Sequence, residues 1–179
     1  MQNETGGKIL KKLYFILAIL TAMSASVAVH AEDDIIIEGE KPYKCNFAAY
    51  SKTGVSGFHG NGLLAFDVAK YNSGVDYSVE YKAYVPSEGV YEISIIGIGC
   101  NYEYTNDYFV TINGSEEEIP VAGGRVEKDI ETTFASNLIK RINIGTQYLN
   151  KGENSIKIRL DTDDLRSDGT LVFYLDYIK

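Results

Sequence analysis

Three carboxylate side chains near the two ends of the chain could together bind a cation. Glu38 and Glu40 lie two apart within residues 35–40, a stretch that predicts a strand, so we expect both side chains on one face. Two like charges on one face repel each other unless a cation joins them. Asp176 lies in the apolar closing stretch 174–178, where a carboxylate also needs a partner. If the first and last strands are neighbours, the three carboxylates converge.

Calcium is the natural occupant of such a cluster, because it is a hard cation that takes oxygen ligands, backbone carbonyls included. Four glycines in residues 54–62 indicate backbone that turns sharply or approaches another group closely, and this segment could supply carbonyls. An ordinary solvated strand face in an acidic protein explains Glu38 and Glu40 equally well. The spacing alone leaves both interpretations open.

Aromatic residues are the second chemical resource of the chain, which has 14 tyrosines, 7 phenylalanines and no tryptophan. Tyr102, Tyr104 and Asn106 lie in a segment that we expect at a strand end. Such a segment binds sugars when ring faces stack on the aromatic side chains and hydroxyls meet the amide. Asn61 and Tyr174 are further candidates. The alternative is a hairpin loop whose tyrosines fold onto the edge of the domain.

Several classes of function are disfavoured by what the sequence lacks. His59 is the only histidine after residue 31, which excludes multi-histidine metal sites. No G-x-S-x-G or P-loop motif is present. A small glycoside hydrolase that used Glu38 and Glu40 would need a cleft between acid and base, and two residues on one strand face give none. We therefore expect a protein that is not an enzyme.

The first 31 residues have the three parts of a secretory signal peptide. Basic residues at 8, 11 and 12 precede an apolar run over 13–29, and small residues flank a cleavage point after Ala31. An uncleaved membrane anchor is the alternative. Cleavage leaves 148 residues, one domain over 32–179, with 14 basic and 24 acidic residues and a net charge of −10. This charge argues against nucleic acid and anionic membranes as partners, so we expect an extracellular protein with no membrane contact.

The rest of the chain predicts short strands. Residues 77–85 alternate between apolar and polar, Pro86 to Gly89 predicts a turn, and 90–96 predicts a buried second strand. Asn113-Gly114 is a strong hairpin signal, and residues 154–160 and 171–178 predict two further strands. About nine strands and no amphipathic helix indicate an all-β sandwich or barrel. Secretion would permit a disulfide between Cys45 and Cys100, although the sequence does not decide their pairing.

The order of several motifs resembles family 6 and family 35 carbohydrate-binding modules. The similar segments are IEGE at 37–40, GFHGNGLL at 57–64, YSVEYKAYVPSEGVYEISI at 77–95, VTING at 110–114, LNKGENSI at 149–156 and LDYI at 175–178. The resemblance implies a jelly-roll β-sandwich of the galactose-binding-like type, in which Glu38, Glu40 and Asp176 hold a structural calcium ion. It departs from the family pattern in the absence of tryptophan and in Tyr174, where an asparagine is common.

These observations together predict a secreted, non-catalytic module that binds a polysaccharide or another glycan. Such modules usually accompany a catalytic domain, so a glycoside hydrolase on another chain is a further expected partner. The alternative is a protein-binding or surface-structural β-sandwich without sugar binding, because a fold does not fix a function.

Overall fold

The computed structural model describes residues 34–48, 50–53, 58–68, 75–98, 107–122, 125–126, 132–134, 139–163 and 169–179. Residues 34–179 form one compact unit, and the predicted signal peptide lies outside the described residues. The described residues form fourteen strand segments, nine of which have four or more residues, and one 3-10 turn. Within them, no helix is long and apolar enough to cross a membrane.

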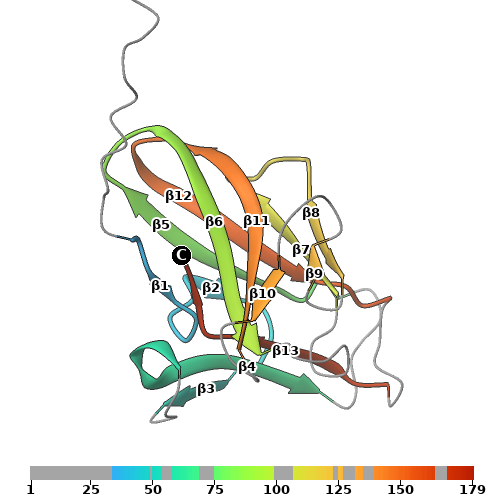
Figure 1. Ribbon diagram of the computed structural model, residues 1–179. Helices are drawn as coiled ribbons and strands as arrows, with labels where there is room; N and C mark the ends of the chain where they lie inside the picture. The colour runs from blue at the N-terminus through green and yellow to red at the C-terminus, as the bar shows by residue number, and fades with distance from the viewer. Residues whose placement is uncertain are drawn as a thin grey trace, which may run out of the picture. The chain divides into compact units, whose positions relative to one another are not determined.

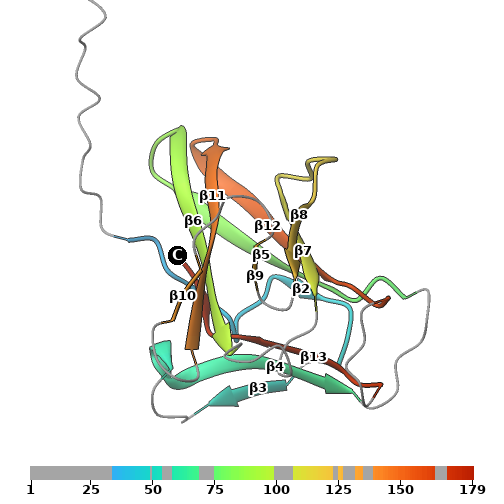
Figure 2. The same ribbon diagram turned by 45° about the vertical axis from the view of Figure 1, so that its right-hand side comes forward.

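The strands form three antiparallel sheets (Figures 1 and 2). The six-stranded sheet has the order β2 (Lys44–Cys45), β5 (Ser78–Val85), β12 (Gly152–Leu160), β7 (Tyr108–Ile112), β8 (Ile119–Ala122) and β9 (Arg125–Val126). The five-stranded sheet has the order β1 (Ile37–Glu38), β14 (Tyr177–Ile178), β6 (Gly89–Ile98), β11 (Ile139–Leu149) and β10 (Thr132–Phe134). The three-stranded sheet contains β13 (Leu171–Leu175), β4 (Gly62–Val68) and β3 (Tyr50–Thr53). The expected all-β sandwich is confirmed.

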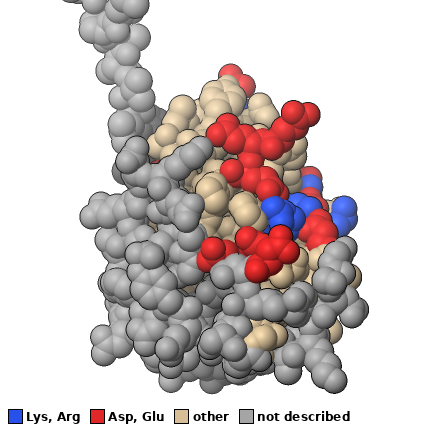
Figure 3. All heavy atoms as spheres, turned by 90° about the vertical axis from the view of Figure 1, so that its right-hand side faces the viewer, with Lys and Arg blue, Asp and Glu red and all other residues tan. Residues whose placement is uncertain are grey.

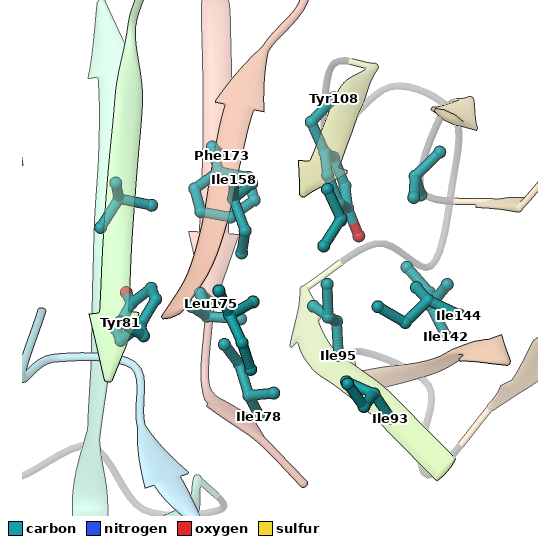
Figure 4. Packing of buried hydrophobic residues seen from close by; sticks show 14 of the residues in the cluster. Tyr81, Ile93, Ile95, Tyr108, Ile142, Ile144, Ile158, Phe173, Leu175 and Ile178 are labelled. Carbon is teal, nitrogen blue, oxygen red and sulfur yellow. The ribbon is translucent and has the colours of Figure 1, made fainter. Parts of the chain in front are cut away.

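The core lies between the sheets, as Figure 4 shows. On β5, the side chains at alternate positions from Val79 to Val85 are buried, which confirms the two-residue period of this stretch. On β12, Ile156, Ile158 and Leu160 are buried in the same way. Across the core they face apolar side chains of the five-stranded sheet, including those at positions 93, 95, 142 and 144 (Figure 4).

The strands β5 and β6 flank the predicted turn but do not pair with each other. β5 pairs with β2 and β12, whereas β6 pairs with β11 and β14. The turn at residues 86–88 therefore carries the chain from one layer of the sandwich to the other. Both strands are confirmed, and the tertiary structure places them in opposite sheets.

Two asparagines fix neighbouring turns. Asn113 and Gly114 both have positive φ, 51° and 66°, as the hairpin signal at this position requires. The buried Asn154 side chain accepts hydrogen bonds from Asn113 Nδ2 (2.8 Å) and the Asn150 backbone (3.0 Å), and it donates to the Asn150 carbonyl (2.8 Å). One amide thus joins the β11–β12 turn to the end of β7.

The outer face of the six-stranded sheet carries paired charges. Lys82 Nζ lies 3.5 Å from Glu80 Oε1 and 3.1 Å from Glu153 Oε1. Arg159 forms a bidentate ion pair with Glu118. Figure 3 shows a small group of Lys and Arg side chains beside Asp and Glu on the face that it views. Solvent screens the partly exposed Lys82 pairs, so each of these contributes little to stability.

Candidate functional site

The first and last strands bring the three predicted carboxylates to one corner of the sandwich. β1 pairs with β14, with Glu38 opposite Tyr177, so the expectation that the first and last strands are neighbours is confirmed. The Gly39 backbone N–H then donates to the Asp176 carbonyl over 2.7 Å. Glu38 and Asp176 are thereby held on adjoining segments.

The prediction that Glu38 and Glu40 share one strand face is wrong. β1 ends at Glu38, and Gly39 and Glu40 lie in a turn. The physical reason is the close approach of the closing segment. A Cβ on Gly39 would lie 2.3 Å from the Leu175 carbonyl oxygen, which leaves no room for a side chain.

Asp176 lies where the closing segment passes from one sheet to another. The expected continuous strand over 171–178 is broken here into β13 and β14, and the Asp176 N–H donates to the Ile96 carbonyl over 2.8 Å. Its side chain is buried, with 1% of the residue exposed. Burial raises the pKa of the Asp176 carboxyl to about 6, and the negative charges of Glu38 and Glu40 act in the same direction.

The described part of the predicted glycine-rich segment lies directly against the two glutamates. Residues His59–Asn61 form the 3-10 turn η1, in which Gly60 has a φ of +58°. A Cβ on Gly60 would lie 3.0 Å from Glu38 Oε2, and one on Gly62 would lie 2.8 Å from the Glu40 carboxyl carbon. The glycines therefore leave the space that the carboxylates occupy, which is the close approach that the glycine density predicted.

His59 also belongs to this cluster, which the sequence alone did not predict. Its backbone N–H donates to Asp176 Oδ1 over 2.9 Å, and its Nδ1 lies 2.9 Å from Glu38 Oε1. Its ring packs against Tyr177, with 4.9 Å between the ring centroids. The signal that could have identified it is its position between Gly57 and Gly60.

The cluster has features of a cation site. Glu38 Oε2 is buried and accepts no hydrogen bond in the described structure, a costly arrangement for an anionic oxygen. The donors are carboxylate oxygens, which suit a hard cation. As the side chains stand, the described His, Cys, Asp and Glu residues form no group of three or more that could hold a metal ion. The donor chemistry thus fits calcium, and binding would have to draw the carboxylates together.

Two of the five candidate sugar-binding residues lie near this corner along the chain. Asn61 ends η1 directly before Gly62. Tyr174 lies on β13 opposite Ala65, two residues before Asp176. Because Leu171, Phe173 and Leu175 face the core, Tyr174 is on the opposite side of the three-stranded sheet, where it is half-buried.

The other three candidates, Tyr102, Tyr104 and Asn106, lie outside the described residues. Cys100 also lies outside the described residues. Cys45 is half-buried, and its thiol donates to the Phe47 carbonyl over 3.4 Å.

No protein-family model matches the sequence, and no curated protein matches it. Solved structures do match the fold. A family 35 carbohydrate-binding module from Clostridium thermocellum is 17% identical, with a TM-score of 0.52, over 80% of this chain and 96% of the module. The GH26-CBM35 β-(1,4)-mannanase of Podospora anserina is 16% identical, with a TM-score of 0.51, over 80% of this chain and 26% of the mannanase.

A third match is a cycloisomaltooligosaccharide glucanotransferase of Paenibacillus sp. complexed with cycloisomaltoheptaose. It is 18% identical, with a TM-score of 0.51, over 80% of this chain and 18% of that protein. The chain thus spans a small part of each enzyme and nearly all of the separate module. Its architecture is that of the family 35 carbohydrate-binding modules.

Proposed function

We propose that this protein is a secreted, non-catalytic carbohydrate-binding module. The observation that carries the proposal is the fold match over 96% of a separate family 35 module. The carboxylate cluster supports it, because Glu38 and Asp176 meet at the junction of the first and last strands. The strongly acidic composition, with 25 acidic against 17 basic residues, suits a neutral polymer better than an anionic one.

The proposed glycan site includes Tyr102, Tyr104 and Asn106, and Asn61 and Tyr174 are further candidates. Tyrosine rings would stack on sugar faces, and the amides would bind hydroxyls. Asn61 and Tyr174 each lie within two residues of the carboxylate corner or its glycines along the chain.

A calcium ion bound by Glu38, Glu40 and Asp176 would stabilise the closure of the sandwich. The buried Glu38 Oε2 without a hydrogen bond and the space left by Gly60 and Gly62 support this assignment. The ion would neutralise the repulsion among the carboxylates and link the opening and closing segments of the chain. Glu38→Ala or Asp176→Ala should lower the melting temperature and abolish its dependence on calcium. Equal melting temperatures of the wild type in calcium and in excess chelator would remove the calcium proposal.

A glycoside hydrolase is the expected partner, whether on the same or on another chain. This rests on the mannanase and the glucanotransferase, each of which contains a region of this fold. The module would hold the enzyme near its polymer and so raise the local substrate concentration.

Affinity gel electrophoresis of residues 32–179 in calcium tests the function. The panel should include β-1,4-mannan, in view of the matched mannanase, and isomaltooligosaccharides should be tested as competitors, in view of the matched glucanotransferase. Retardation by one class of polymer is the expected result and would name the ligand. No retardation of folded protein by any polymer would favour the protein-binding alternative.

Variants locate the site. Tyr102→Ala and Tyr104→Ala should each abolish most of the retardation, since stacking is the main contribution of a ring. Tyr84→Ala is the matched control, because Tyr84 is a 72% exposed ring on the outer face of β5. If the Tyr102 and Tyr104 variants bind as tightly as the control, the site lies elsewhere.

A further inference from the structure

His59 joins the two segments that carry the carboxylates. Its backbone N–H donates to Asp176 Oδ1, and its ring nitrogen Nδ1 lies 2.9 Å from Glu38 Oε1. The ring itself rests against Tyr177 on β14. One residue therefore contacts the end of β1 and the start of β14 at once.

The contact between His59 and Glu38 uses Nδ1 of the ring and Oε1 of the carboxylate. A carboxylate oxygen accepts hydrogen bonds, so this contact requires the histidine tautomer with a hydrogen on Nδ1, and that N–H donates a hydrogen bond to Oε1. The second oxygen of Glu38, Oε2, is then left buried, with no hydrogen bond within the described part of the chain. His59 thereby orients the carboxylate so that one oxygen is satisfied and the other remains available.

The backbone of the same segment supports this orientation. Gly60, the next residue, has a φ of +58°, and an added Cβ would lie only 3.0 Å from Glu38 Oε2. The missing side chain of Gly60 thus leaves room for Glu38 Oε2, while the His59 ring contacts Oε1.

We propose that His59 is the positioning residue of the cation site, which turns Glu38 Oε2 toward the ion and holds Asp176 beside it. The inference rests on the calcium site proposed above. Hydrogen bonds that orient metal ligands commonly change metal affinity by about 10- to 100-fold when they are removed. We expect an effect of that size when the ring donor to Glu38 is removed, whereas the backbone hydrogen bond to Asp176 is kept in any side-chain variant.

The test compares two replacements of His59. His59→Asn keeps a side-chain N–H close to the position of Nδ1, whereas His59→Leu keeps an apolar side chain against Tyr177 and removes the donor. Isothermal titration calorimetry of the protein with calcium chloride gives the dissociation constant of each. Thermal unfolding in excess chelator gives the stability of each variant without the ion.

We expect His59→Leu to weaken calcium binding about 10- to 100-fold, and His59→Asn to stay within a few-fold of the wild type. Both variants should unfold in chelator at nearly the same temperature. A purely structural role would instead lower the stability of the variants in chelator and leave the calcium affinity unchanged, and this result would overturn the proposal.

Two further outcomes are informative. Tighter calcium binding by His59→Leu would mean that His59 competes with the ion as a positive charge, which contradicts a positioning role. Absence of calcium binding by the wild type would overturn the calcium site and this inference together. Glycan retardation that persists in that case would leave the carbohydrate-binding proposal standing.

Discussion

Gly97 and Gly89 lie on the same strand and provide a matched pair of substitutions. β6 runs from Gly89 to Ile98. At Gly97 its backbone lies against the backbone of the closing segment at Tyr174. A Cβ on Gly97 would lie 2.2 Å from the Tyr174 carbonyl oxygen, whereas one on Gly89 would meet nothing within 4 Å. The same chemical change, glycine to alanine, therefore meets backbone at one site and open space at the other.

The expected cost of Gly97→Ala follows from this distance. Ordinary contact begins at 3.4 Å, so the closing segment would have to move by more than about 1 Å. That movement would strain the hydrogen bond from Asp176 N–H to the Ile96 carbonyl, which is 2.8 Å long. Overpacking of this kind costs about 1–3 kcal/mol, and we expect the upper end because neither partner is a flexible side chain.

Gly89→Ala should change the unfolding free energy by less than about 1 kcal/mol and in the stabilising direction, since alanine restricts the unfolded chain. Equilibrium denaturation in urea, followed by circular dichroism, measures both variants. For a domain of this size, the loss in Gly97→Ala corresponds to a melting temperature lower by about 5–10 °C. Unfolding free energies of the two variants within about 0.5 kcal/mol of each other would refute the close packing of β6 against β13.

Three further predictions concern buried polar groups. Tyr81→Phe removes the hydrogen bond from the buried hydroxyl to the Gly39 carbonyl (2.7 Å) and should cost about 1–2 kcal/mol in urea denaturation. Asn154→Ala leaves the polar groups of two turns unpaired and should lower the unfolding free energy by about 2–4 kcal/mol. Glu153→Ala is the control, because Glu153 lies on the exposed side of β12, and it should change the unfolding free energy by less than about 0.5 kcal/mol. Equal losses in the two variants would contradict the hydrogen bonds assigned to Asn154. The third prediction concerns Asp176 in the presence of chelator. Its pKa is raised to about 6 in the folded protein, so between about pH 4 and pH 6 the folded state binds a proton that the unfolded state has released. Its contribution to stability is therefore present below about pH 4 and lost as the pH rises through about 6, so Asp176→Asn should flatten this decline in unfolding temperature.

The candidate site was only partly accessible to sequence reasoning. The convergence of the carboxylates was predicted from the expectation that the first and last strands are neighbours, and the pairing of β1 with β14 confirms that expectation. Their shared strand face was predicted wrongly, because a two-residue spacing does not reveal where a strand ends. The turn at Gly39 is imposed by the carbonyl oxygens of the closing segment, which is more than a hundred residues away in the chain.

The sequence by itself determined the local features of this protein. Alternation along β5 and β12 identified the buried faces, and Asn113-Gly114 identified a hairpin, because these signals depend on neighbouring residues alone. Only the tertiary structure decided that β5 and β6 belong to opposite sheets, that the closing strand breaks at Asp176, and that His59 contacts Glu38. Each of these features depends on the packing of segments that are distant in the chain. A local sequence pattern does not contain that information.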